Sequence, residues 1–313
     1  MQHLGEIMAL TVAILWTITA LVAEFAVKRI GPLVTNIIRM VLSMLLLTAT
    51  MFVMTGSLTP QYTDLKTWFI FTLSGIVGYV FGDTCLFSAY ARIGSRFTQL
   101  FMTLAAPSAA LAGWLLLDEC LSIKCLIGIA LTSTGIGISV LNRKRDDEGH
   151  NHTNLKLPFS GILLAIGAAL GQGVGLVISK MGISNYESLI PENANSISIS
   201  IPFASTFMRS VAGLIGFSAI LFIRGEHSKM TRIFHDRKGL LLLLIATITG
   251  PFLGVALSLE STRHTSVGIA QTLMALTPVL ILLPSYLISR QRVTWIEIVG
   301  ALLSVVGVAF FFI

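Results

Sequence analysis

Charge is scarce in this chain: only 12% of its 313 residues are charged, whereas 54% are hydrophobic. A soluble domain of ordinary composition carries roughly 25% charged residues. The mean hydropathy of +0.85 reflects long apolar runs, and it excludes a soluble globular fold. The composition therefore predicts an integral membrane protein.

Cysteine is also scarce, and the motifs of soluble enzymes are missing. Cys85, Cys120 and Cys125 are odd in number and lie in or beside apolar runs, which disfavours a disulfide framework or a zinc site. All the histidines lie at the chain ends or in expected loops. The sequence contains no Gly-x-Ser-x-Gly, no His-Glu-x-x-His and no phosphate-binding glycine loop. We expect no catalytic residues, no metal and no cofactor.

Apolar runs long enough to cross a bilayer recur along the whole chain. A hydrocarbon core of about 30 Å needs roughly 20 apolar residues in a helix. The first run lacks a preceding basic segment, so we expect a span and not a cleaved signal. We predict an all-α integral membrane protein with ten transmembrane helices, near residues 5–24, 33–54, 67–90, 97–117, 122–141, 159–181, 201–223, 238–260, 266–288 and 293–312.

One stretch of the sequence occurs twice. The first copy reads ARIGSRFTQLFMTLAAPSAAL from Ala91, and the second reads TRHTSVGIAQTLMALTPVLIL from Thr262. At offsets of 171 or 172 residues, several residues meet residues of the same type: Arg92 and Arg263, Ser95 and Ser266, Gln99 and Gln271, Pro107 and Pro278, Gly128 and Gly300. A repeat of five spans has an odd number of crossings, so its second copy must enter the membrane from the opposite side. We therefore predict two inverted five-helix repeats, 1–141 and 159–313, joined by a cytoplasmic linker, 142–158.

Basic residues outside the spans gather in alternate loops. Most of them lie in the first, third, fifth, seventh and ninth connections, and the opposite side has Lys66, Lys124, Lys180 and Arg263. The positive-inside bias puts the basic connections in the cytoplasm and both termini outside. The net charge of +6 is thus explained by membrane orientation and does not indicate nucleic acid. The expected partners are the lipid bilayer and a small-molecule substrate, with a homodimer as an open alternative.

Glycine and proline mark special positions within the spans. Gly167, Gly171 and Gly175 are four residues apart and share one helix face, and Gly78 and Gly82 repeat the spacing in the third span. Small residues allow close helix packing, which is either static or a surface for sliding. We expect Pro107 and Pro278 inside helices, where each is either a fixed kink or a hinge that exposes backbone carbonyls.

Polar residues within the spans are candidates for a binding cavity. Tyr and Trp are more often anchors at the membrane interface, but some of these residues lie near the middle of a span. The candidates for cavity lining are Trp16, Tyr79, Gln99, Gln172, Arg209 and Gln271.

Arg39, Asp83 and Arg209 are ionisable groups placed well inside spans, where such groups are costly and usually mark a function or a pair. Arg39 and Asp83 fall at similar depths on consecutive helices, so we expect an ion pair that is structural or concerned with coupling. At an offset of 171, the counterpart of Asp83 is Gly254, so Arg209 has no analogous partner and is the better candidate for a substrate ligand.

Several of these residues carry a family resemblance. Trp16 and Lys28, the arginines Arg39 and Arg209, the two prolines, Glu119 and the paired Gly128 and Gly300 resemble EamA-type ten-helix permeases of the drug/metabolite transporter superfamily. The second half departs from the pattern, with Gln172 for the Trp and Arg290 for the Glu. The resemblance implies alternating-access transport of small organic metabolites or drugs across the cytoplasmic (inner) membrane, coupled to protons or to exchange. An integral-membrane enzyme or a non-transporting receptor is the alternative.

Overall fold

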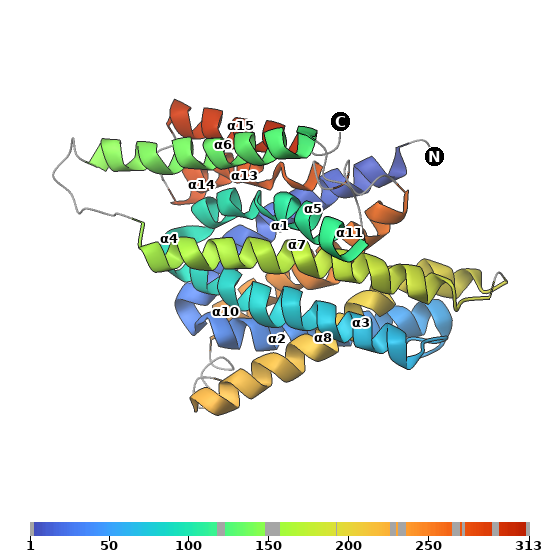
Figure 1. Cartoon of the computed structure of the whole chain (residues 1–313). Helices are drawn as coiled ribbons and strands as arrows, with labels where there is room; N and C mark the ends of the chain where they lie inside the picture. The colour runs from blue at the N-terminus through green and yellow to red at the C-terminus, as the bar shows by residue number, and fades with distance from the viewer. Residues whose placement is uncertain are drawn as a thin grey trace.

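All regular elements that the structure describes are helices. The computed structural model describes residues 3–117, 123–147, 157–191, 193–225, 230, 236–264, 270, 273–289 and 294–310. Its elements are α1 (Leu4–Ile30), α2 (Pro32–Thr55), α3 (Leu65–Gly75), η1 (Ile76–Asp83), α4 (Thr84–Met102), α5 (Ala105–Leu117), α6 (Ile123–Asp147), α7 (Phe159–Glu187), α8 (Asn195–Arg224), α10 (Arg237–Thr247), η2 (Ile248–Phe252), α11 (Leu253–His264), α13 (Thr277–Leu280), α14 (Leu282–Ser289) and α15 (Trp295–Ala309) (Figure 1).

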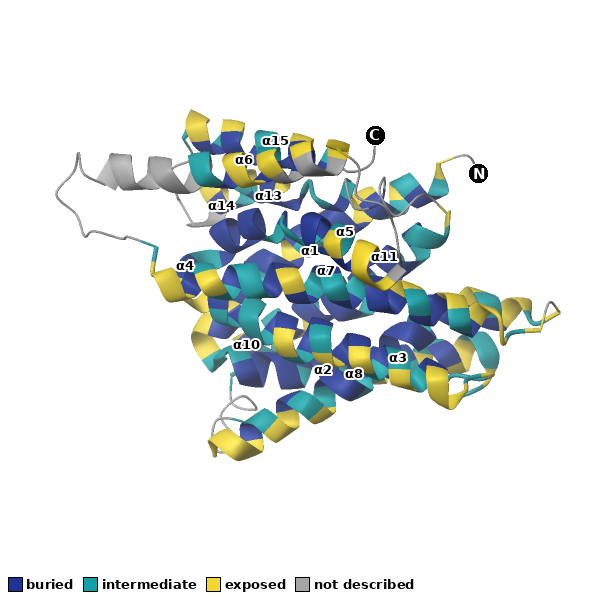
Figure 2. Ribbon diagram, in the orientation of Figure 1, coloured by how far each residue is buried: buried dark blue, intermediate teal, exposed yellow. Residues whose placement is uncertain are grey.

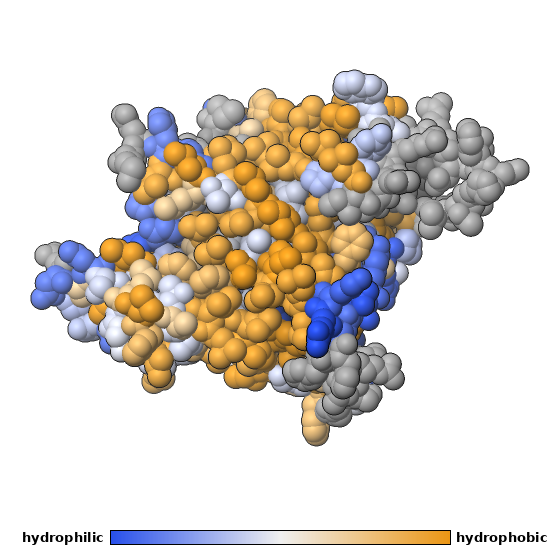
Figure 3. Space-filling model, turned by 180° about the vertical axis from the view of Figure 1, so that it is seen from behind, coloured by the Kyte–Doolittle hydropathy of each residue, from blue (hydrophilic) through white to orange (hydrophobic). Residues whose placement is uncertain are grey.

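The length and composition of these helices suit a membrane. Six helical stretches in the described residues are long and apolar enough to cross a bilayer, and three shorter apolar helices accompany them. Hydrophobic side chains cover the middle of the surface, whereas hydrophilic ones gather toward its two sides (Figure 3). Buried residues line the interior between the helices (Figure 2). The chain is therefore a multi-pass membrane protein.

The first helix of each half packs along the third span of the other half. On α1, the Gly5 carbonyl accepts a hydrogen bond of 2.9 Å from Ser261, and the Thr19 hydroxyl lies 2.7 Å from that of Thr249. Helix α1 thus runs antiparallel to α10, η2 and α11. Helix α7 runs in the same way against α3, η1 and α4, since Gly171 and Gly175 lie against Gly82 and Gly78.

The two halves run in opposite directions. Helix α1 ends at the face where Arg29 binds Asp236, and α10 begins there. Helix α7 begins at the same face, where its Gly161 lies against Ile93 near the end of the third span. Figure 1 shows the resulting antiparallel course of α1 and α7. The described residues thus form two inverted repeats, and we call this end of the molecule, with Lys28 and Arg29, the basic face.

The third spans share the same construction in both halves. Asp64 accepts a hydrogen bond of 2.7 Å from the Thr67 N–H and starts α3. Asp236 accepts one of 3.0 Å from the Gly239 N–H and starts α10. Side chains that accept from the first free N–H groups stabilise a helix start. Each helix then widens into a π-helix, η1 or η2, a rare form that occurs frequently at functional sites.

The fourth span is broken, which corrects our expectation for the prolines. Gly94, with φ 78°, splits α4, and a second break at Thr103 and Leu104 precedes α5. Pro107 is therefore the third residue of a new helix, and Pro278 lies in the first turn of α13. Proline is tolerated there because the first N–H groups of a helix lack intrahelical acceptors. The prediction that both prolines interrupt continuous helices is wrong, and their role as hinges stays a prediction.

The fifth spans, α6 and α15, pack tightly on each other. A Cβ atom on Gly135 would lie 2.5 Å from the Gly300 carbonyl, and one on Gly307 would lie 2.4 Å from the Thr132 nitrogen. Only glycine permits this approach, because the opposing atoms are backbone. The pair ties the end of one half to the end of the other, and it lies at the edge of the bundle in Figure 1.

Candidate functional site

A cavity of about 140 Å³ lies at the centre of the bundle, between the two halves. A single water needs only ~10–15 Å³ on such a measure, so the space exceeds that of a few waters. Its wall includes residues of both π-helices. It also includes Thr103 and Ala275, which lie at the turns that break the fourth span at 103–104 and the ninth span at 275–276. Its lining includes Trp16, Thr19, Arg39, Tyr79, Asp83, Leu86, Phe87, Tyr90, Gln99, Met102, Thr103, Gln172, Leu176, Arg209, Gly250, Pro251, Val255, Ser258, Met274, Thr277 and Pro278.

Arg39 and Asp83 form a buried ion pair on this wall. Their side chains are about one-twentieth exposed, and Arg39 Nη1 lies 3.5 Å from Asp83 Oδ2. The other carboxylate oxygen accepts a hydrogen bond of 2.8 Å from Gln172 Nε2. Arg39 also donates to Asn36 and lies 4.3 Å above the ring of Phe87. These contacts compensate part of the cost of burying both charges.

Arg209 is buried without such a partner. It is 3% exposed, and its guanidinium lies 4.8 Å above the ring of Tyr79. Its Nε has no hydrogen-bond partner, and no carboxylate of the described residues lies within ion-pair distance of it. The side chains of the described wall that are charged at neutral pH are Arg39, Asp83 and Arg209, so the wall carries an excess of one positive charge.

Glycines of the π-helices make room for both arginines. A Cβ atom on Gly78 would lie 2.8 Å from Nη2 of Arg209. One on Gly250 would lie 3.1 Å from Nη2 of Arg39. Each arginine therefore lies against a glycine of the other half's π-helix, and these two glycines are 172 residues apart. The internal two-fold relation of the repeats extends into the cavity.

The remaining polar candidates fall into two groups. The cavity is lined by Trp16, Tyr79, Gln99 and Gln172, and their role in binding a substrate stays a prediction. Gln99 donates a hydrogen bond of 2.7 Å to the hydroxyl of Tyr90 on the same wall. Gln271 lies outside the described residues.

The glycine stripe of α7 contacts the first π-helix. A Cβ atom on Gly171 would lie 2.7 Å from Cα of Gly82, and one on Gly175 would lie 3.0 Å from Cα of Gly78. Gly167 lies further along, against the Cys85 side chain. This approach holds Gln172 beside Asp83, so the stripe positions part of the cavity wall.

Sequence reasoning missed the role of Glu24. This residue of α1 is 7% exposed, and its carboxylate accepts hydrogen bonds of 2.7 and 2.6 Å from the backbone and hydroxyl of Ser95. Lys28 lies 2.5 Å from its other oxygen. Glu24 thus caps the helical segment that follows the break at Gly94. The sequence held two signals of this cap: the spacing of four residues between Glu24 and Lys28, and the Gly94-Ser95 pair. Nothing in the sequence indicated that these two segments lie close together.

A second ion pair lies near this cap. Arg96, directly after Ser95, pairs with Glu297, which also caps the start of α15 together with Thr294. Both side chains are buried. Their 201 residues of separation left no local pattern for sequence reasoning to use.

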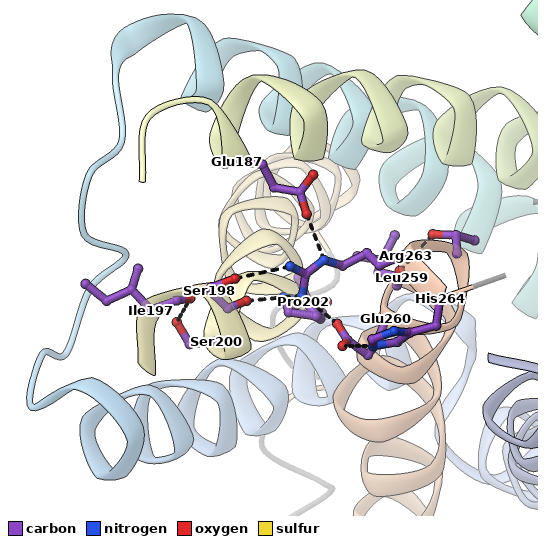
Figure 4. A network of polar contacts seen from close by, with 11 residues as sticks. Glu187, Ile197, Ser198, Ser200, Pro202, Leu259, Glu260, Arg263 and His264 are labelled. Atoms are coloured by element: carbon purple, nitrogen blue, oxygen red, sulfur yellow. Dashed lines mark hydrogen bonds and ion pairs between the residues drawn. The ribbon is translucent and has the colours of Figure 1, made fainter. Parts of the chain in front are cut away.

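A polar network joins three helix ends at the face opposite the basic face (Figure 4). Arg263 at the end of α11 lies 2.8 Å from Glu187 of α7 and 2.9 Å from Glu260. It also donates to the Ser198 carbonyl of α8, while His264 lies 2.7 Å from Glu260. Its Glu187, Glu260 and His264 do not come together in an arrangement that could hold a metal ion, and no such group of three occurs elsewhere in the described part of the chain.

Comparisons with known proteins agree with this architecture. The model of the EamA-like transporter family matches residues 3–141 and 159–313, which are the two repeats. No curated protein matches the chain. A crystal structure of a protein with 15% identical residues superposes with a TM-score of 0.62, covering 99% of this chain and 96% of the other. At this identity the likeness concerns the fold alone.

Proposed function

Since the chain belongs to the EamA-like transporter family, we propose that it moves small organic metabolites or drugs across the cytoplasmic membrane by alternating access. The two inverted halves would rock against each other and expose the central cavity to each side in turn. No ATP is needed, and transport is coupled to protons or to exchange. Lipid and a small-molecule substrate are the partners, and a homodimer is compatible with this function.

One observation carries the proposal: buried charged groups line a cavity between two inverted halves, next to broken spans and π-helices. Ionisable groups are costly inside a membrane and are retained chiefly where they bind or pair. Non-helical backbone at membrane depth is tolerated where it lines a cavity. Both features meet at the breaks near Thr103 and Thr277, as expected for a substrate site near the midplane.

We propose Asp83 as the coupling group. It is the acidic residue of the described cavity wall, and its Oδ2 receives no hydrogen bond. Protonation of this oxygen would release Arg39, whereas an exchange mechanism would leave the pair intact throughout the cycle. An imposed pH gradient across proteoliposomes distinguishes the two mechanisms, since proton coupling makes uptake follow the gradient and exchange does not.

The basic face lies in the cytoplasm in this proposal. Reporter fusions after Asn142 and after Arg224 should report cytoplasm, and one after Ser196 should report the outside. The reverse pattern at all three sites would show that the orientation is inverted.

A metabolite comparison tests the function itself. Cells with and without the protein are compared for solutes in the cytoplasm and in the medium, and each candidate is then assayed for counterflow in proteoliposomes. We expect at least one organic solute to change its distribution and to show counterflow. Unchanged solutes in cells, together with no counterflow for any candidate, would refute the proposed transport.

A further inference from the structure

The ion pair in the first half shows how this fold holds a carboxylate. The Asp83 carboxylate receives a guanidinium, Arg39, at 3.5 Å and an N–H donor, Gln172, at 2.8 Å. Both donors come from helices other than η1. Asp83 therefore occupies a small anion site, formed by one arginine and one uncharged donor at the cavity wall.

The second half contains the matching donors. Arg209 corresponds to Arg39, because each lies against the π-helix glycine of the opposite half. Trp16 corresponds to Gln172, because Gln172 lies against Gly82 and Trp16 lies against Gly254, 172 residues later. A Cβ atom on Gly254 would lie 2.7 Å from the indole Nε1 of Trp16.

The carboxylate itself is missing from the second half. The two third spans align at an offset of 172 residues, which separates the helix caps Asp64 and Asp236 and also the starts of the two π-helices. At this offset, the residue that corresponds to Asp83 is Val255. Val255 lines the cavity. Gly254, the counterpart at the neighbouring offset, also lacks a carboxylate. The two donors are left unused: Arg209 Nε has no partner, and Trp16 makes no hydrogen bond within the described part of the chain.

We propose that an anionic group of the substrate takes this vacant position, held by the guanidinium of Arg209 and the indole N–H of Trp16. This inference rests on the proposed transport function and specifies its substrate class. The substrates are organic anions in which a charged group the size of a carboxylate is attached to an apolar body. The apolar body fits the remaining wall, which includes Leu176, Val255 and Met274. An anion there also neutralises the excess positive charge of the cavity, and an unpaired buried charge is costly.

The direct test uses three probes of one shape: 3-phenylpropionate, 3-phenylpropionamide and 3-phenylpropylamine. Binding to the purified full-length protein is measured by thermal shift, with chloride alone as a further arm, and transport by counterflow in proteoliposomes. We expect the carboxylate to bind, and the amide, the amine and chloride to bind at least ~10-fold more weakly, because only the carboxylate offers charge-assisted hydrogen bonds to both donors.

Variants then locate the site. Arg209→Gln should weaken carboxylate binding ~10–100-fold. Trp16→Phe keeps an aromatic ring but loses the N–H donor, so it should weaken carboxylate binding ~2–10-fold. Arg92→Gln removes the same charge from an exposed position on the basic face and should leave binding unchanged. Val255→Asp places a built-in carboxylate at the vacant position, so it should abolish carboxylate binding, whereas the uncharged Val255→Asn should retain it.

The Val255 pair keeps the proposal testable if Arg209→Gln does not fold. Equal carboxylate binding by Val255→Asp and Val255→Asn overturns the proposal, as does equal binding of the amide or of chloride by the wild-type protein. If the metabolite comparison finds a neutral or cationic solute whose counterflow is unaffected by Trp16→Phe, the anion site is wrong and the transport function stands. Absence of any transported solute would instead remove the function.

Discussion

The two halves of the molecule share a scaffold and differ in polarity. Both begin their third span with an aspartate cap, widen it into a π-helix and place a glycine against an arginine of the other half. The polar groups on this scaffold diverge. Ser74 and Ser179 form a hydrogen bond of 2.7 Å, whereas their counterparts, Ala246 and Ala23, pack in an apolar cluster. The symmetric backbone therefore creates the cavity, and the asymmetric side chains determine its chemistry.

Of the changes that test this difference between the halves, breaking the Arg39–Asp83 ion pair should lower the stability of the protein most. Arg39→Gln leaves Asp83 as an uncompensated buried charge, which costs about 3–5 kcal/mol. We expect a large loss of membrane yield and of thermal stability in detergent. Asp83→Asn should also harm the protein, because Arg39 then loses its carboxylate.

The double variant is the control for this pair. Arg39→Gln with Asp83→Asn removes both charges of the pair and leaves an uncharged pair of side chains in their place. It should recover part of the lost stability, since neither charge is then left unpaired. A double variant as unstable as the sum of the single variants would show that the two residues do not interact.

Gly171→Leu should come next in size. The counterpart of Gly171 in α1 is Leu15, so this change gives the second half the residue that the first half has at this position. The Cβ alone would lie 2.7 Å from the backbone of Gly82, and overpacking typically costs about 1–3 kcal/mol. We expect lower thermal stability and loss of transport. Wild-type yield together with wild-type transport would show that this face of α7 does not pack closely against η1.

The two repeated arginines at the ends of the third spans should behave unequally. Arg263 joins α7, α8 and α11, whereas its repeat partner Arg92 is exposed. Arg263→Gln should lower stability by about 1 kcal/mol, because exposed or half-exposed ion pairs contribute little each. Arg92→Gln should stay within about 0.5 kcal/mol of the wild type. Thermal unfolding of both variants in the same detergent measures the difference, and equal losses would contradict it.

The smallest effect concerns the helix caps, and it depends on pH. Arg29 and the Gly239 N–H lower the pKa of Asp236 to about 2. A lowered folded-state pKa stabilises the protein above the unfolded value, and this contribution disappears as the pH falls through about 2. Asp236→Asn should therefore lower stability slightly near neutral pH, and the difference from wild type should shrink in acid. A difference that grows in acid would contradict this assignment.

The repeated stretches and the charged residues of the spans could be recognised in the sequence, because similarity and charge are visible in it directly. A charge such as Asp83 in an apolar run is conspicuous, and its depth follows from counting residues along a helix. The family prediction is confirmed by the match over both repeats. The exact number of ten spans stays a prediction, since the described residues include six long apolar helices and three shorter ones.

The breaks and widened turns were beyond sequence reasoning. A run such as Ile76–Asp83 is apolar whether it forms an α-helix or a π-helix, so its composition does not distinguish the two. Proline suggested an irregularity near residue 107, but the chain breaks before it, at Thr103, and again at Gly94. Glu24 looked like a residue near a span end, and its partner Ser95 lies 71 residues away. Contacts over such distances are set by packing and leave no local pattern.

The exchange of partners between the halves also has a consequence for biosynthesis. Helix α1 is made before α10, η2 and α11, against which it packs, and the Thr19 and Thr249 hydroxyls that meet are 230 residues apart. At about 5–20 residues per second, synthesis of that interval takes ~10–50 s. During this time the face of α1 that carries small and polar residues contacts lipid or the insertion machinery instead of its final neighbours. Helix α1 thus reaches these neighbours only after most of the described spans have been made.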